Sequence, residues 1–117
     1  MNVFDGNKQK LDYHSEDIWM FTDSRIENES RIFSCAKEPD TVKWIEEYFK
    51  PDDVVFDIGA NVGAYTLIMS KVVGEKGKVF SFEPNWINFY KLNRNIVLNK
   101  ATNNVTALNW ALSSSKR

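Results

Sequence analysis

Ten residues that lead from an apolar run into a helical pattern decide the fold of this chain: Val54-Val55-Phe56-Asp57-Ile58-Gly59-Ala60-Asn61-Val62-Gly63. The run over residues 54–58 is apolar on both sides of an extended chain, which is typical of a central parallel strand. Gly59 allows a sharp turn out of this strand, and Gly63 allows the next helix to pack closely. The stretch therefore predicts a ligand pocket at the carboxyl end of the strand.

The pattern around this stretch alternates between helix and strand. Apolar residues recur at helical spacing after two helix-start signals, a proline in a first turn and an asparagine cap. Alternating strands and helices imply a parallel sheet with right-handed crossovers. The predicted fold class is α/β, a Rossmann-like parallel sheet with flanking helices, with strands over 54–58, 78–82 and 105–110 and helices that begin near Pro39, Gly63 and Asn85.

The first 37 residues give weaker signals. We expect residues 1–17 to be a polar, weakly structured lead-in. The apolar run Ile18–Phe21 is of uncertain type, and Arg31–Ser34 is a short strand or part of a turn. We accordingly divide the chain into a lead-in over residues 1–37 and half of a Rossmann-like domain over residues 38–117.

Composition excludes several classes of protein. The chain has 117 residues and a formal net charge of −1, which fits one small domain and gives no argument for nucleic-acid binding. No apolar run approaches the length of a membrane span, and no signal peptide is recognisable. Cys35 is the single cysteine, so a reducing compartment, the cytoplasm, is expected. His14 and Cys35 do not support a metal site.

Two acidic residues indicate which ligand the pocket takes. Glu83 ends the second strand, beside the loop that starts at Gly59, and an acid there can accept both hydroxyls of a ribose. Asp57 places a carboxylate near the loop, which suits an ammonium group better than a pyrophosphate. The spacing D-x-G-x-x-x-G, without a phosphate-loop Gly-Lys-Ser/Thr, therefore favours S-adenosyl-L-methionine over NAD.

Each of these residues also has a purely structural interpretation. Gly59 and Gly63 can form only a tight turn, and Asn61 can be a turn residue that tolerates left-handed geometry. Asp57 can bond the N–H groups of the loop. Glu83 can interact with the dipole at the start of the third helix. The sequence alone leaves these alternatives open.

Four blocks of this sequence resemble the FkbM family of methyltransferases: Asp57-Ile58-Gly59-Ala60-Asn61-Val62-Gly63, Phe80-Ser81-Phe82-Glu83-Pro84-Asn85, Asn95-Ile96-Val97-Leu98-Asn99 and Ala111-Leu112-Ser113. These are class I S-adenosylmethionine-dependent enzymes, many of which methylate hydroxyl groups on sugars and natural products. The resemblance implies that Asp57 approaches the ammonium of the cofactor and that Glu83 holds the ribose. It also implies further cofactor contacts from Gly59, Ala60, Asn61, Gly63, Pro84, Asn85 and Trp110.

The chain departs from the family in two respects. Trp86 stands where the family often has proline, and three placements are open for it: facing inward, packing near the adenosine, or merely covering the start of the helix. The chain also supplies only three of the seven strands of the class I fold, so the acceptor pocket and any catalytic base are absent from it. The first strand would then be an exposed apolar edge, which tends to pair with another copy or a partner chain.

Three functions remain in competition at this point. The first is a methyltransferase that acts on a hydroxyl of a sugar or small molecule, or the cofactor-binding part of such an enzyme. The second is a fragment of an NAD-dependent oxidoreductase, which would share Glu83 but leave Asp57 and Asn61 unexplained. The third is a non-catalytic remnant or interaction module that keeps the sheet without turnover.

Overall fold

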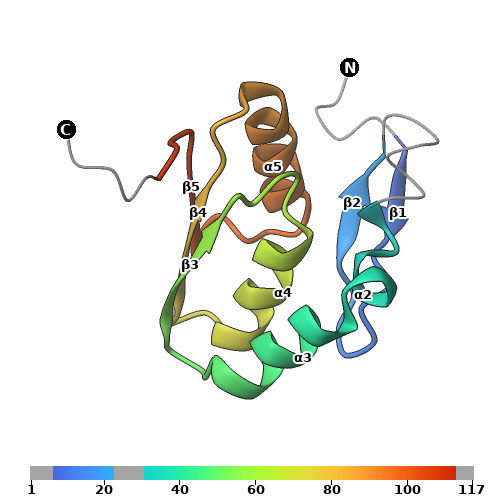
Figure 1. Ribbon diagram of the computed structural model, residues 1–117, viewed down its shortest axis with the longest axis vertical. Helices are drawn as coiled ribbons and strands as arrows, with labels where there is room; N and C mark the ends of the chain where they lie inside the picture. The colour runs from blue at the N-terminus through green and yellow to red at the C-terminus, as the bar shows by residue number, and fades with distance from the viewer. Residues whose placement is uncertain (1–6, 23–30, 113–117) are drawn as a thin grey trace.

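Three layers make up the computed structural model, which describes residues 7–22 and 31–112 (Figure 1). A parallel sheet forms one outer layer, helices form the middle layer, and an antiparallel hairpin lies on the far side of the helices. The last residue of the FkbM-like block that ends in Ser113 lies outside the described residues.

The sheet consists of β3 (Val54–Ile58), β4 (Lys78–Phe82) and β5 (Val105–Leu108) in the order β3-β4-β5, with both pairs parallel. The predicted fold class is thereby confirmed. The bounds predicted for the first two strands are correct, whereas the third ends at Leu108, before Trp110. Beyond Leu108 the chain no longer pairs with β4, because Phe82 is the last residue of that strand.

The three predicted helices are also present. α3 (Pro39–Tyr48) begins with its proline in the first turn, and α4 (Ala64–Val73) starts directly after Gly63. α5 (Trp86–Leu98) is capped by Asn85, whose side-chain oxygen accepts the backbone N–H groups of Ile87 and Asn88, each at 3.0 Å. A side-chain acceptor at this position satisfies N–H groups that have no partner within the helix.

The prediction of a weakly structured lead-in is wrong for β1 (Lys8–Lys10), which pairs antiparallel with β2 (Trp19–Phe21). The uncertain apolar run is therefore largely a strand. Two asparagines bond its outer edge, one in α5 and one directly after it: Asn95 Oδ1 accepts the Phe21 N–H and Asn99 Oδ1 accepts the Trp19 N–H, both at 2.8 Å. Because these partners lie far away in the sequence, the local pattern could not reveal them.

A short helix, α2 (Ser34–Lys37), follows a turn at Ile32 and Phe33. The strand alternative for residues 31–34 is wrong, and the turn alternative is confirmed for Ile32 and Phe33. The carboxylate of Asp12 accepts the N–H groups of Cys35 and Ala36 at 2.9 and 2.8 Å. This contact fixes α2 to the hairpin and satisfies two N–H groups at the start of the helix.

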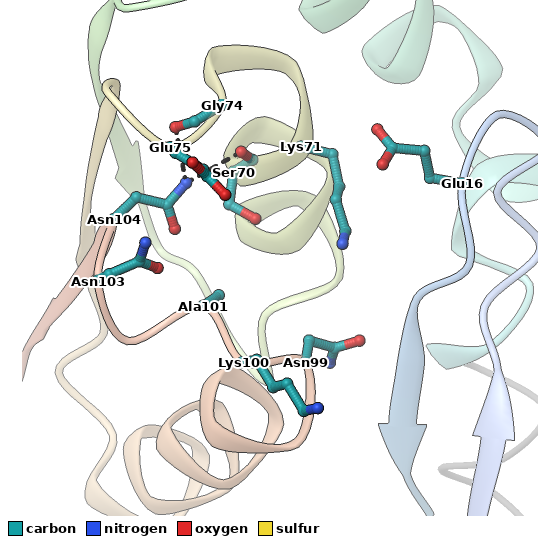
Figure 2. Close-up of a pocket in the computed structure, with 10 residues that line it drawn as sticks. All are labelled: Glu16, Ser70, Lys71, Gly74, Glu75, Asn99, Lys100, Ala101, Asn103 and Asn104. Carbon is teal, nitrogen blue, oxygen red and sulfur yellow. Dashed lines mark hydrogen bonds between the residues drawn. The ribbon is translucent and has the colours of Figure 1, made fainter.

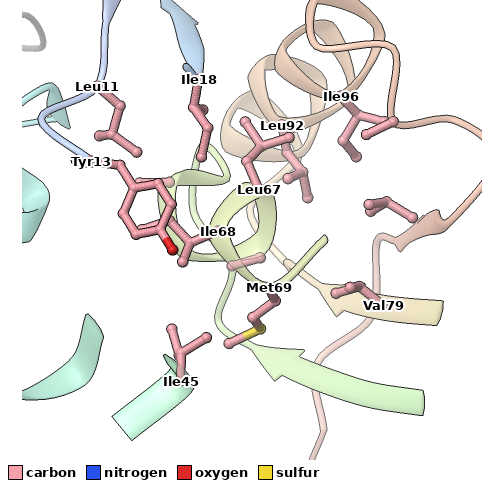
Figure 3. Close-up of a cluster of buried hydrophobic side chains, with 14 of the residues drawn as sticks. Leu11, Tyr13, Ile18, Ile45, Leu67, Ile68, Met69, Val79, Leu92 and Ile96 are labelled. Carbon is pink, nitrogen blue, oxygen red and sulfur yellow. The ribbon is translucent and has the colours of Figure 1, made fainter. Parts of the chain in front are cut away.

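One face of the sheet lies against the helices. Val55, Val79 and Val105 face this side and are buried. They belong to a hydrophobic cluster that runs through the helices to the hairpin, as Figure 3 shows. Its members from the other layers include Leu11, Ile18, Ile45, Leu67, Ile68, Leu92 and Ile96.

The opposite face of the sheet is open in the described residues. Val54, Phe56 and Ile58 are 63%, 59% and 63% exposed, although Val55 of the same strand is buried. The ring of Phe56 contacts those of Phe80 and Phe82, at centroid distances of 5.8 and 5.6 Å. Within the described residues β3 is an edge strand, in agreement with the exposed apolar edge expected from the sequence.

Candidate cofactor-binding site

The loop between β3 and α4 folds back onto the end of β4. The N–H groups of Gly59 and Ala60 both donate to the Phe82 carbonyl, at 2.8 and 3.0 Å. Three loop residues have left-handed backbone angles, with φ of 75° at Gly59, 53° at Asn61 and 104° at Gly63. Non-glycine residues rarely adopt such angles, and asparagine is among those that tolerate them best. The turn interpretation of Asn61 therefore holds for its backbone.

The two loop glycines have different spatial surroundings. A Cβ atom built on Gly63 would lie 2.8 Å from Cδ1 of Leu92, so the close packing predicted for this position is confirmed. A Cβ atom on Gly59 would meet nothing within 4 Å. Gly63 is thus needed for contact between α4 and α5, whereas the space beside Gly59 is open to a ligand.

Glu83 ties the two loops at this end of the sheet together. Its side chain is 4% exposed, and Oε1 accepts the Asn61 N–H at 2.7 Å. Oε2 accepts the Asn85 N–H at 2.9 Å. Hydrogen bonds to an ionised acceptor are stronger than neutral ones, and each carboxylate oxygen keeps a second lone pair. Glu83 can therefore hold the loops and still accept a ligand hydroxyl.

Asp57 lies on the helix-covered face of β3 and is half-buried. Its Oδ2 accepts the Thr66 hydroxyl at 2.5 Å, and within the described part of the chain no hydrogen bond reaches Oδ1. Burial raises the pKa of Asp57, the Thr66 hydrogen bond lowers it, and the charge of Glu83 raises it. The alternative in which Asp57 bonds the loop N–H groups has no support among the described hydrogen bonds.

The other predicted site residues fall into two groups. Pro84 and Asn85 follow Glu83 directly, and the amide of Asn109 holds this turn by donating to the carbonyls of Glu83 and Pro84 at 2.8 and 3.0 Å. Trp110 lies instead against the ring of Phe82, with centroids 6.3 Å apart, on the open face of the sheet. Trp86 is 72% exposed, so the inward-facing placement is wrong.

Sequence reasoning missed a buried support of the loop, Asn95. This side chain is 1% exposed. Its Nδ2 donates to the Val62 carbonyl at 2.8 Å, and its Oδ1 accepts the backbone N–H of Phe21 in β2. An asparagine on the apolar face of a helix, between Leu92 and Ile96, was the available signal, because a buried amide requires hydrogen-bond partners.

Two hollows lie at opposite ends of the parallel strands. A small one of about 30 Å³ adjoins the loop and is lined by Arg31, Ser34 and residues 60–65. A larger one of about 430 Å³ lies where β4 and β5 begin, and Figure 2 shows its lining residues, among them Lys71, Lys100 and Asn104. The Asn104 amide there is already bonded to the carbonyls of Ser70 and Gly74.

Residues 7–22 and 31–112 contain neither a membrane-spanning helix nor a metal-ligand cluster. No helix there is long and apolar enough to cross a membrane. Nor do three or more His, Cys, Asp or Glu side chains in that part gather where they could hold a metal ion.

Burial, together with the carboxylate of Asp12, raises the pKa of the Cys35 thiol to about 12, which makes it a poor nucleophile.

The family model of protein-L-isoaspartate(D-aspartate) O-methyltransferase (PCMT) matches residues 7–109. The chain belongs to this family of methyltransferases. It is a member of the class I S-adenosylmethionine-dependent methyltransferases, which agrees with its fold and with the arrangement of loop and acidic residues described above.

Two curated relatives are also methyltransferases. The hexuronic acid methyltransferase AglP of Haloferax volcanii is 36% identical over 95 residues, which are 81% of this chain and 37% of that protein. Methyltransferase sdnD of Sordaria araneosa is 39% identical over 61 residues, 52% of this chain and 23% of that protein. The chain thus spans less than two fifths of the length of either relative.

A solved structure supports the fold and matches most of the chain. TYW2 of P. horikoshii, crystallised in complex with MeSAdo, superposes with a TM-score of 0.63 at 29% identity. The superposition covers 85% of this chain and 35% of that one. The described elements thus correspond to one part of a longer methyltransferase chain.

Proposed function

We propose that this chain is the cofactor-binding part of an S-adenosyl-L-methionine-dependent methyltransferase, formed by residues 38–117. One observation carries the proposal: Asp57 and Glu83 flank the Gly59–Gly63 loop at the carboxyl ends of two adjacent parallel strands. Ligands of open parallel sheets bind beyond these ends.

The donors and acceptors of this region fit the parts of the cofactor. Glu83 keeps lone pairs for the ribose hydroxyls, and Oδ1 of Asp57 is available to the ammonium group. The open space at Gly59 admits the methionine part, with Ala60, Asn61 and Gly63 along it. When bound, the cofactor supplies an activated methyl group, and the enzyme aligns this group with an acceptor.

We further propose an FkbM-type acceptor, a hydroxyl group on a sugar. The quoted sequence blocks support this assignment, as does the relative whose name describes methylation of a hexuronic acid. The described residues offer no group that we assign as the base. Covering of the exposed edge at β3, by further chain or by a second copy, would complete the sheet.

Calorimetric titration of the purified chain with S-adenosyl-L-methionine and with NAD tests the assignment. We expect binding of the first and none of the second, because Asp57 would repel a pyrophosphate. Glu83→Gln should weaken binding about tenfold or more, since hydrogen bonds to a charged group contribute about 1.5–3 kcal/mol. Glu75→Gln, which changes an acid at the opposite end of the sheet, should leave the affinity unchanged. Binding of NAD alone would overturn the proposal.

A further inference from the structure

Three oxygen atoms beneath the candidate site form a chain that crosses from α4 to two strands. The Thr66 hydroxyl lies 2.5 Å from Oδ2 of Asp57 and 2.7 Å from Oγ of Ser81. The side chains of Thr66 and Ser81 are both 0% exposed. Asp57 and Ser81 are register partners on β3 and β4, so Thr66 spans the pair from the helix above.

The direction of the two hydrogen bonds follows from counting hydrogens. A hydroxyl has one hydrogen, and an ionised carboxylate has none. Thr66 must give its hydrogen to Asp57 while that residue is ionised, so Ser81 must donate to Thr66. If Asp57 becomes protonated, the acid can donate to Thr66 and the chain can run the other way. The orientation of the chain therefore depends on the charge of Asp57.

This arrangement leaves one carboxylate oxygen unused. Oδ2 is held by Thr66, and within the described residues Oδ1 receives no hydrogen bond. The charged group that acts on Asp57 is Glu83, at the end of β4. The other polar groups on this side are the Thr66 hydroxyl of α4 and the Ser81 hydroxyl of β4. Burial and the charge of Glu83 both favour the protonated acid, and the bond from Thr66 opposes them.

We propose that Thr66 and Ser81 are positioning residues that keep Asp57 ionised and direct its Oδ1 toward the ammonium group of the cofactor. The inference rests on the proposed function but assigns roles to two residues that the cofactor need not touch. A buried hydroxyl chain with one fixed direction holds the carboxylate in one orientation. Its removal should therefore change the charge of Asp57 as well as its position.

The first test needs no ligand. The pKa of Asp57 is measured in the free chain by NMR of its carboxyl carbon. Thr66→Val, which keeps the shape but removes the hydroxyl, should raise that pKa, and Ser81→Ala should raise it less. Thr66→Ser restores the hydroxyl and should return the pKa toward that of the unaltered chain. Ser70→Ala is the matched control, because Ser70 is also buried on α4 but bonds the Leu67 carbonyl.

The second test measures the affinity for S-adenosylhomocysteine as a function of pH. Thr66→Val should bind about tenfold more weakly at neutral pH, the loss expected from one hydrogen bond to a charged group. The pH at which binding is half lost should also move upward, in step with the pKa of Asp57. A folded Thr66→Val or Ser81→Ala variant with an unchanged pKa of Asp57 would overturn the inference. Failure of the unaltered chain to bind the ligand would instead overturn the proposed function.

Discussion

The two ends of the parallel sheet differ: one has the larger hollow, and the other has the side chains suited to binding a cofactor. At the amino ends of β4 and β5 lies the larger hollow, about 430 Å³, with lysines at its rim and the Asn104 amide bonded to backbone carbonyls (Figure 2). At the carboxyl ends the hollow is about 30 Å³. Only the second region combines a buried carboxylate, a half-buried carboxylate and a left-handed glycine loop.

Volume is therefore a poor guide to the binding site of this chain. The larger hollow is an opening between the end of α4, the turn after α5 and the segment before β2. At the carboxyl ends the hollow is small, yet Asp57, Glu83 and the glycine loop lie at that end. Hydrogen-bond donors, acceptors and charge therefore distinguish the two regions better than volume does.

The largest effect should come from Gly63→Ala. The new Cβ atom would lie 2.8 Å from Leu92 in a left-handed backbone. Left-handed strain costs about 1–2 kcal/mol, and overpacking of a filled core adds about 1–3 kcal/mol. Chemical denaturation should therefore show a loss of roughly 2–5 kcal/mol. A loss below about 1 kcal/mol would mean that α4 and α5 do not pack as closely as described.

A matched pair of glycines compares the two ends of the sheet directly. Gly59 and Gly74 have φ of 75° and 74°, and neither would place a Cβ atom within 4 Å of another atom. Gly59→Ala should therefore cost about 1–2 kcal/mol of stability, and Gly74→Ala should cost about 1–3 kcal/mol, because Gly74 has ψ of −173°, in a region that is essentially restricted to glycine. Only Gly59→Ala should also weaken the binding of S-adenosylhomocysteine. Equal affinities in the two variants would contradict the proposed position of the ligand.

Asp57→Asn should slightly stabilise the fold, although it should weaken binding of the cofactor. The pKa of Asp57 is raised by burial, so folding favours the protonated acid, and this contribution is lost as the pH rises through the raised pKa. At neutral pH the variant should be at least as stable as the unaltered chain, and the difference should shrink as the pH falls. Thermal melts at several pH values would show whether a neutral side chain instead destabilises the fold.

Changes at the amino end should have the smallest effect. Lys71 and Lys100 line the larger hollow, and neither is placed in the proposed site. Lys71→Ala and Lys100→Ala should each alter the free energy of unfolding by no more than about 0.5 kcal/mol. Titration should give unchanged affinity for the cofactor. A marked loss of affinity in either variant would transfer the site to this end.

The sequence predicted the parallel sheet because its signals are local. Runs such as Val54–Ile58 and the caps at Pro39 and Asn85 have the residue types that strands and helix starts require. The hairpin could not be predicted this way, since β2 is held by Asn95 and Asn99 across 74 and 80 residues of sequence. Long-range side-chain bonds to a strand edge leave no periodic pattern near that strand.

The candidate site was predictable to a similar extent. Asp57, Gly59 and Glu83 are separated by spacings that carry meaning in parallel sheets, so they could be identified as a set. The hydroxyl chain of Thr66 and Ser81 could not, because a buried serine or threonine has no distinctive sequence pattern. Trp110 was assigned to the adenine side by resemblance, and its contact with Phe82 depends on where β5 ends.

Glycine amide resonances offer the most direct test of the central claim that the cofactor binds at the carboxyl ends of the strands. Gly59 and Gly63 lie in the loop at that end, whereas Gly74 and Gly77 lie in the turn at the other end. In a titration with S-adenosylhomocysteine followed by NMR, we expect large shifts for Gly59 and Gly63 and small ones for Gly74 and Gly77. Shifts confined to Gly74 and Gly77 would contradict that claim.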